Sequence, residues 1–435
     1  MKKKLPASLF TAVFLLLCVL PSLGFFIFGP AEAGANERLA ARPSIRERDG
    51  SLNSSYLSEL SEYFSGRFFL RQEMITANNA VTAAVLGSSA EEDVILGSDG
   101  WLYYADTLAD YTGAERLSDA QLRAAAKNLS LMQEYCQARG VDFLFTLAPN
   151  KNSLYPENMP DYGAVAAERD AQRLYALCDG LGVDYLDLFA VFEAQDELLY
   201  FAHDSHWNSR GAALAADAIY AAFGRESDYF GGDFSSVAAH TGDLFEMLYP
   251  AADDGETDPQ YSPAIELEYE GSGVRPDSIS IVAHGGGEGG LLAYRDSFGN
   301  LLYPYLADGF ETARFSRSTA YDLSGLEGVD CVLVELVERN IDYLISNVPV
   351  MPAPERSVPA GELVSMELTR TEGGSAPEGC VLVEGSLDET AAGAYIICGS
   401  TAYESFLTES GFAAYIPADA EVSGVHIEQF IYEMN

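Results

Sequence analysis

Apolar residues between positions 118 and 223 follow two different spacings along the chain. Stretches with apolar residues at helical spacing alternate with short, nearly continuous apolar runs, which are typical of strands buried on both faces. The predicted elements are helices over 119–139, 165–181 and 212–223 and strands over 141–148 and 183–188. Strand and helix in alternation predict an α/β fold with a doubly wound parallel sheet.

The segment 224–290 interrupts this pattern. It is rich in Asp, Gly and Ser, and only two short strands are expected in it, at 265–269 and 279–283. The α/β pattern then returns, with strands at 291–294 and 330–336 and a helix near 301–306. We therefore interpret 224–290 as an insertion.

Other patterns flank the α/β region. Helical spacing over 56–64 indicates a helical neck, and two short runs around the turn at 98–100 predict a strand hairpin. Prolines between 349 and 359 mark a linker, beyond which short apolar runs predict strands. The expected organisation is an N-terminal segment at 1–33, a neck at 34–90, the α/β domain at 91–350 and a small β domain at 355–435.

The N-terminal segment indicates export. Three lysines at 2–4 precede an uncharged stretch at 5–28, which is long enough for a transmembrane helix. Flanking lysines place the N-terminus in the cytoplasm and the main domain outside it, as a single-pass membrane protein. The alternative is a cleaved signal peptide with its cleavage site at 31–33, which would make the protein secreted.

The composition excludes some classes of binding partner. The 435 residues carry a formal charge of −41, from 66 acidic and 25 basic side chains, so nucleic acid is not expected to bind. Six cysteines occur without a CxxC spacing, which disfavours a zinc-cysteine site. Cys380 and Cys398 either form a disulfide in the small β domain or are free thiols.

Histidine is scarce, and two of the five histidines fall in the segment 201–208. This segment follows a predicted strand and precedes a helix, where sites of parallel sheets form. Asp204 can orient His206 and stabilise its imidazolium. The alternative is structural: Asp204 or Asn208 caps the helix and His206 packs on Trp207. A metal bound by His203, Asp204 and His206 is disfavoured, because the segment reads as a loop without further ligands.

A second segment places Ser297 at a sharp turn between an apolar strand and a helix. There the hydroxyl is exposed and backbone N–H groups can bind an oxyanion. A serine nucleophile needs a base, and a histidine is the usual one. Taken alone, Asp296 and Ser297 would read as a helix cap. Together with the Asp204–His206 pair, they favour a nucleophile.

The two segments resemble the SGNH-like O-acetyltransferases of the alginate O-acetylation group, the DHHW protein family. In that family the Asp-x-His pair precedes the serine, as Asp204 and His206 precede Ser297 here. The stretches 36–40, 96–103, 148–157 and 335–340 also resemble the family. Ser205 departs from the histidine that the family name suggests. The insertion and the small β domain have no family role to transfer.

The resemblance implies an SGNH-hydrolase-like fold with Ser297 as nucleophile, His206 as base and Asp204 as the orienting carboxylate. It also implies O-acyl transfer, in particular O-acetyl transfer, to a cell-surface or secreted polysaccharide. A membrane-bound O-acyltransferase would deliver the acyl donor, and no cofactor is implied. Two alternatives stay open: a carbohydrate esterase or deacetylase with the same triad, and a non-catalytic surface protein that binds glycans.

Five further residues are candidates for contact with substrate. Asn150 is a candidate to bind the oxyanion together with the Ser297 N–H. The candidates for lining the acceptor groove are Lys151, Tyr155, Trp207 and Arg339. Ordinary packing or ion pairing is the alternative for each of them.

Overall fold

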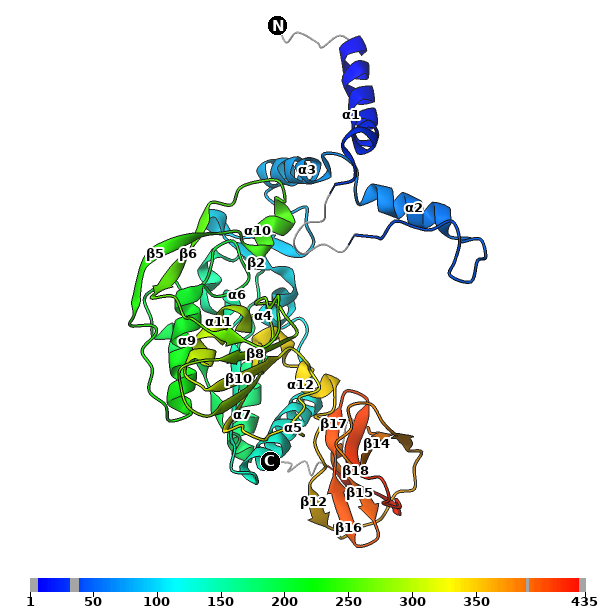
Figure 1. Ribbon diagram of the computed structural model, residues 1–435, viewed down its shortest axis with the longest axis vertical. Helices are drawn as coiled ribbons and strands as arrows, with labels where there is room; N and C mark the ends of the chain where they lie inside the picture. The colour runs from blue at the N-terminus through cyan, green and yellow to red at the C-terminus, as the bar shows by residue number, and fades with distance from the viewer. Residues whose placement is uncertain (1–6, 32–38, 389–390, 430–435) are drawn as a thin grey trace.

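The structure, a computed structural model, describes residues 7–31, 39–388 and 391–429. Helix α1 (Ala7–Phe28) stands at one end of the molecule in Figure 1, and a β-sandwich lies at the other end. The α/β body lies between them. It contains both segments that carry the candidate chemistry.

The α/β body is built on a seven-stranded sheet with the order β4-β3-β11-β9-β10-β8-β7. The first five strands in this order are parallel to one another. Strand β8 pairs antiparallel with β10, and β7 pairs antiparallel with β8. The strands are β3 (Asp142–Ala148), β4 (Tyr185–Leu186), β7 (Glu268–Tyr269), β8 (Ser280–His284), β9 (Gly290–Tyr294), β10 (Thr312–Ser316) and β11 (Cys331–Val337). The predicted parallel sheet is therefore confirmed for these five strands, and the insertion extends one edge with two antiparallel strands.

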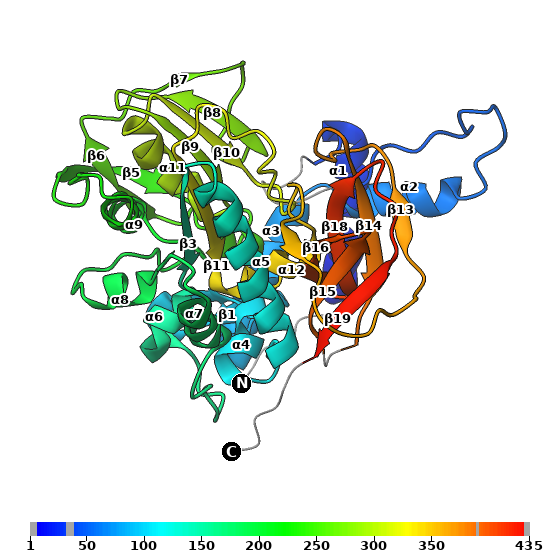
Figure 2. The ribbon, with the colours of Figure 1, turned by 90° about the horizontal axis from the view of Figure 1, so that it is seen from below.

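Helices cover both faces of the sheet (Figure 2). They are α5 (Asp119–Gln137) and α7 (Asp170–Leu181) on one face, and α8 (Leu188–Glu193), α9 (Ser209–Ala222) and α11 (Gly299–Asp308) on the other. Successive residues of β3 enter the two cores in turn, with Phe143 and Phe145 on one side and Leu144 on the other. Because both faces are covered, β3 is apolar almost throughout.

Capping groups decide where two of these helices begin. Helix α7 begins at Asp170 rather than at 165, because the backbone of Arg169 is extended and its N–H donates to the Gln172 side chain at 3.0 Å. Helix α8 was not predicted, since the strand before it is shorter than expected. The Asp187 side chain caps α8 by accepting a hydrogen bond from Ala190 N at 3.3 Å.

The insertion forms a hairpin that the sequence did not predict. Strands β5 (Asp233–His240) and β6 (Glu256–Ser262) pair antiparallel, and the short helix α10 (Asp243–Leu248) lies between them. Most residues of β5 are exposed. The hairpin therefore has no apolar alternation, and its strands are held by backbone pairing and by polar contacts with the α/β body.

The C-terminal part is a sandwich of two four-stranded sheets, in agreement with the predicted β domain. One sheet has the order β12-β16-β15-β19 and the other β13-β14-β18-β17. Their strands are β12 (Glu355–Ser357), β13 (Thr369–Thr371), β14 (Cys380–Ser386), β15 (Ala391–Cys398), β16 (Thr401–Glu404), β17 (Phe406–Thr408), β18 (Gly411–Pro417) and β19 (Gly424–Gln429). Cys380 and Cys398 are free thiols, one in each of the two sheets.

The N-terminal part contains α1, the neck helices α2 (Tyr56–Ser65) and α3 (Arg71–Leu86), and the predicted hairpin of β1 (Val94–Leu96) and β2 (Leu102–Tyr104). Within the described residues, no single helix is long and apolar enough to cross a membrane. Two segments of α1, Leu9–Leu16 and Val19–Phe28, meet that requirement only together, with a bend of 40° between them. The membrane anchor and the four-part division of the chain stay predictions.

Candidate active site

The carboxyl ends of three neighbouring strands meet at one edge of the central sheet. Asn150 follows β3, Ser297 follows β9, and Arg339 follows β11. The loop before α9, which carries Asp204 and His206, lies beside them. A cavity of about 950 Å³ opens here, and Asp204, His206, Ser297 and Arg339 are among the residues that line it. Clefts at strand ends are the usual position for sites in parallel sheets.

A continuous chain of hydrogen bonds joins Asp204, His206 and Ser297. Asp204 Oδ1 lies 2.7 Å from His206 Nδ1, and His206 Nε2 lies 2.8 Å from Ser297 Oγ. Asp204 Oδ1 also accepts a hydrogen bond from the backbone N–H of His206 at 3.0 Å. The structure thus brings together the three side chains that the sequence proposed as a triad. Their distances suit proton transfer from the serine to the imidazole.

Nearby charges set the basicity of His206. Burial lowers the pKa of the imidazole, but the carboxylates of Asp204 and Asp243 outweigh it, so the pKa of His206 is raised above its ordinary value of 6.5. Burial would raise the pKa of Asp204. Contacts with His206 and His240 reverse this, and the pKa of Asp204 lies well below its ordinary range. Asp204 therefore stays ionised over the pH range in which His206 is uncharged and can act as a base.

Asp296 holds the turn that presents Ser297. Its Oδ1 accepts from Phe298 N at 2.9 Å, and its Oδ2 accepts from Val337 N at 2.7 Å and from Asn340 Nδ2 at 2.8 Å. Asp296 therefore ties the turn to the end of β11. Asp296 and Ser297 do not form the helix cap considered as the alternative, because Phe298 is the capping residue of α11 and no side chain in the described part of the chain caps it. The Ser297 hydroxyl is directed at His206.

Asn150 is fully buried and is not among the described residues that line the cavity. Its Oδ1 accepts a hydrogen bond from Arg339 at 3.2 Å, and its backbone N–H donates to Glu338 at 3.0 Å. Its Nδ2 has no hydrogen-bond partner within the described part of the chain. An unpaired buried amide is costly, so Nδ2 is a donor still available to a partner, and the oxyanion role of Asn150 stays a prediction.

Arg339 lines the cavity close to the triad. Its guanidinium lies 5.6 Å from the Phe298 ring centroid and 5.2 Å from that of Tyr104. Its charge also lowers the pKa of His206. Arg339 is thus in a position to contact a bound substrate, as the sequence proposed.

The other three groove candidates are not among the residues that line the cavity in the described structure. Lys151 is buried, and its ammonium donates to the carbonyls of Phe201, Ala202 and Asp204 at 2.7–3.0 Å. It fixes the loop that carries the triad, and burial lowers its pKa to about 7. This placement differs from the prediction because three backbone carbonyls draw the side chain inward, away from the groove.

The two aromatic candidates have structural contacts behind the site. Trp207 is fully buried, and its Nε1 donates to Phe298 O at 3.1 Å. The Tyr155 hydroxyl accepts from Leu199 N at 3.0 Å. Both side chains hold the segment 199–208 against the body of the protein, which corresponds to the packing alternative.

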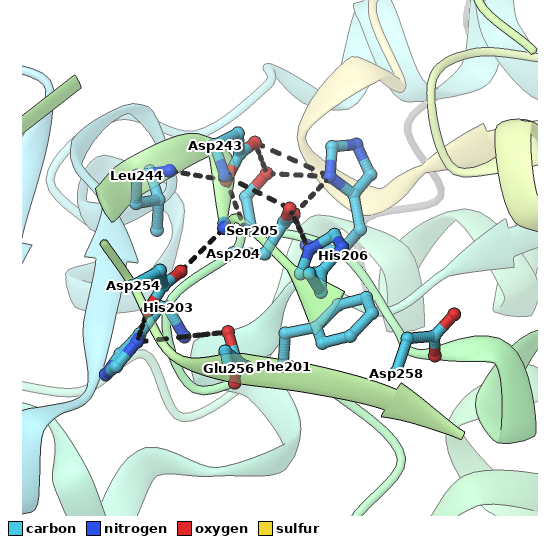
Figure 3. Close-up of polar contacts among 12 residues, drawn as sticks. Phe201, His203, Asp204, Ser205, His206, Asp243, Leu244, Asp254, Glu256 and Asp258 are labelled. Carbon is cyan, nitrogen blue, oxygen red and sulfur yellow. Dashed lines mark hydrogen bonds and ion pairs between the residues drawn. The ribbon is translucent and has the colours of Figure 1, made fainter. Parts of the chain in front are cut away.

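The insertion supplies functional neighbours that the sequence reading missed. Figure 3 shows the side chains of Asp243, Asp254 and Glu256 around the loop of Asp204 and His206. Asp243 accepts from Ser205 N at 2.7 Å and from Ser205 Oγ at 2.6 Å. The acidic residues at alternate positions 254, 256 and 258 were an available signal, since alternate residues of a strand point to one side.

The three metal ligands considered from the sequence, His203, Asp204 and His206, do not form one group. His203 turns away from the triad and contacts Asp254, so it does not join Asp204 and His206 in one cluster. Two groups of donor atoms do lie close together, one around His203 and one around Asp204. Their carboxylates accept backbone N–H groups, for example Glu256 from Ala202 N at 2.7 Å and Asp254 from Gly242 N at 2.7 Å. These contacts account for the clusters as loop supports.

Parts of this chain are similar to known proteins. Residues 94–278, which include Asp204 and His206 but not Ser297, match the family model described as the SGNH hydrolase-like domain of acetyltransferase AlgX. A probable alginate O-acetylase AlgJ of Pseudomonas syringae pv. tomato is 28% identical over 167 residues, which cover 36% of this chain and 41% of that protein. The match therefore spans about two fifths of the length of that relative.

Two solved structures are also similar. Bacillus cereus PatB1 has a TM-score of 0.43 and 16% identity, over 57% of this chain and 96% of that one. A DHHW family protein from Eubacterium siraeum has a TM-score of 0.43 and 17% identity, over 59% and 95%. The family model and the curated relative confirm the resemblance to the SGNH-like O-acetyltransferases of the alginate O-acetylation group, over residues 94–278 for the family model.

Proposed function

We propose that this protein transfers O-acyl groups, in particular acetyl groups, to a polysaccharide outside the cytoplasm, through an acyl-enzyme on Ser297. The observation that carries the proposal is the unbroken hydrogen-bonded chain from Asp204 through His206 to Ser297, at 2.7 and 2.8 Å. The similarity to a probable alginate O-acetylase supports the choice of acetyl group and of a polysaccharide acceptor.

In the first half-reaction, Ser297 Oγ attacks the carbonyl carbon of the acyl donor while His206 Nε2 takes its proton. Asp204 stabilises the resulting imidazolium. The Ser297 N–H and the free Asn150 amide donate to the developing oxyanion. When the carbon–oxygen bond to the leaving group breaks, His206 returns the proton to the departing oxygen. The acyl group then remains as an ester on Ser297.

In the second half-reaction, a sugar hydroxyl enters the cavity and loses its proton to His206 as it attacks the ester carbonyl. Ser297 leaves and recovers the proton, which closes the cycle. Arg339 and Tyr343 line the cavity with polar groups that suit a hydroxylated acceptor. A membrane-bound O-acyltransferase is the partner we propose for delivery of the donor, next to a chain held at the membrane by α1.

Incubation of the detergent-solubilised full chain with 4-nitrophenyl acetate, followed by intact-mass measurement, tests the proposal. We expect one acetyl adduct on the wild type and none on Ser297→Ala, with much slower formation on His206→Ala. An equal adduct on Ser297→Ala would refute the nucleophile. Addition of a glycan then separates the acceptors: faster loss of the adduct with acetylated sugar supports transfer, and release of acetate alone supports the esterase alternative.

A further inference from the structure

The hairpin of the insertion holds the loop that carries Asp204 and His206. Its acidic side chains accept the backbone N–H groups of this loop: Asp243 from Ser205, Glu256 from Ala202 and His203, and Asp258 from Ser209. The distances lie between 2.7 and 3.1 Å. A part of the chain without an assigned role thus shapes the environment of the triad.

One side chain of this hairpin reaches the triad itself. His240, the last residue of β5, lies with Nε2 2.9 Å from Asp204 Oδ2. Its ring stacks on Phe201, with the ring centroids 3.8 Å apart and the planes within 9°. The His240 side chain is 26% exposed and lines the cavity. Stacking and hydrogen bonding together restrain the orientation of the imidazole.

The contacts of Asp204 divide between its two oxygens. Oδ1 accepts from the ring and the backbone of His206, whereas Oδ2 accepts from His240 and from Asp243 N at 3.1 Å. A carboxylate held by four donors cannot rotate without losing some of them. Rotation would otherwise take Oδ1 out of line with His206 Nδ1.

We propose that His240 is a positioning residue of this site, which holds the Asp204 carboxylate in the orientation that serves His206. The inference rests on the proposed function, since it assigns His240 a part in the activation of Ser297. Asp204 is then shared by two imidazoles, one from the triad loop and one from the insertion.

The two imidazoles compete for the same carboxylate when both are charged. Burial lowers the pKa of His240, but the hydrogen bond to Asp204 and the charges of Asp204, Glu256 and Asp258 raise it overall. Asp243, which contacts the same carboxylate through its backbone, adds a further acidic neighbour. A protonated His240 reduces the negative charge that His206 experiences, so it makes His206 a weaker base. Acylation should therefore fall with acid over a broader pH range than a single histidine gives, because each protonated imidazole makes the other harder to protonate.

NMR titration of the five histidines tests the contact without reference to activity. In full-length protein with Asp204→Asn, the titration midpoints of both His206 and His240 should move to lower pH, because a charge that raises both pKa values is removed. His426, which lies in the β-sandwich, serves as the control and should not move. An unmoved His240 midpoint would overturn the inference even if Ser297 acylation is confirmed.

Kinetics of Ser297 acetylation test the positioning role. We expect His240→Ala to lower kcat about 10-fold, which corresponds to about 1.4 kcal/mol, with little change in KM. His240→Gln can still donate an N–H to Asp204 and should restore most of the rate. The acid limb of the pH profile should also become steeper in both variants and approach that of a single histidine. Unchanged kcat and slope in His240→Ala, beside an inactive Ser297→Ala, would reject His240 and leave the proposed function intact.

Discussion

At the residue scale, the site depends on how buried charges are arranged around one imidazole. His206 is partly buried, which by itself makes it a poorer base. The charges of Asp204 and Asp243 more than compensate and raise the pKa of His206, whereas the charge of Arg339 lowers it. Such a balance adjusts the pKa of a general base to the pH at which it works.

The pH dependence of Ser297 acetylation follows from this balance. The base must be uncharged to accept a proton, and the pKa of His206 is raised, so the rate should increase with pH through a midpoint above 6.5. Asp204→Asn should move the midpoint to lower pH and reduce the rate about ten thousand-fold, as the loss of the orienting carboxylate does in other triads. Stopped-flow release of 4-nitrophenol between pH 5 and 9 measures both. A wild-type midpoint below 6.5 would contradict the assignment of His206.

Removal of the Asn150 amide should weaken stabilisation of the oxyanion. Asn150→Ala is expected to lower kcat about 100-fold with KM nearly unchanged, because the bond forms only as charge develops on the carbonyl oxygen. Asn152→Ala is the matched control, since Asn152 is also buried but donates to Thr107. Steady-state kinetics compare the two variants. Equal effects from both would assign Asn150 a purely structural role.

At the scale of elements, the turn between β9 and α11 determines where the Ser297 hydroxyl points. Arg295 fills the space beneath this turn, and its guanidinium donates to Asp296 O at 3.1 Å and to Asn300 Oδ1 at 2.7 Å. Gly299 lets α11 approach that side chain: a Cβ at 299 would lie 2.4 Å from Arg295 Cδ. The turn therefore requires glycine for space rather than for an unusual backbone angle.

Gly299→Ala should displace Arg295 and with it the serine turn. We expect a loss of stability of about 1–3 kcal/mol, typical of an overpacked interior, together with slower acetylation of Ser297. Thermal unfolding and intact-mass kinetics measure the two effects. Gly286→Ala is the control, because a Cβ there meets nothing within 4 Å. If Gly299→Ala acetylates at the wild-type rate, the close approach is not needed for the turn.

At the scale of the whole molecule, the β-sandwich packs on the α/β body through α5. One hydrophobic core contains residues of α5, the central sheet and the sandwich. The buried Asn128 of α5 donates to Leu344 O and Leu407 O at 2.9 and 2.8 Å, and accepts from Leu407 N at 2.9 Å. This side chain links both parts without contact with the cavity.

Asn128→Ala leaves three buried backbone groups without a partner. We expect a loss of at least about 1–3 kcal/mol in the free energy of unfolding, with unchanged acetylation of Ser297 at temperatures below the transition. Gln137→Ala, at an exposed position of the same helix, should leave the stability nearly unchanged. Calorimetry of the full chain compares them. A parallel loss of activity in the folded Asn128→Ala variant would show that the sandwich contact supports the site.

Helix α1 exposes large apolar side chains, with Phe10 at 69% and Phe26 at 79%. Exposed apolar surface of this kind is stable only when lipid or protein covers it. The full chain should therefore remain in the membrane fraction after alkaline carbonate extraction, and a variant without residues 5–28 should not. A mature protein whose N-terminal sequence starts after Ala33 would support the secreted alternative instead.

The sequence identified the side chains whose position follows from topology. Asp204, His206 and Ser297 could be predicted together because each lies next to a recognisable strand or helix end. Lys151, Tyr155 and Trp207 were assigned to the groove from proximity in sequence. Their direction depends on carbonyls and aromatic rings supplied by distant segments, so the sequence alone did not reveal it.

The spacing of apolar residues therefore determined the helices and strands and the edge of the sheet at which the candidate site lies. A strand that is buried on both faces is recognisable because its residues are nearly all apolar. The spacing did not determine the hairpin of β5 and β6, whose exposed polar residues follow no such pattern. Only the tertiary structure brings His240 to 2.9 Å from Asp204, across 36 positions of the chain. A contact between two polar side chains from separate loops is decided by packing, because no local pattern specifies which distant donor meets a buried carboxylate.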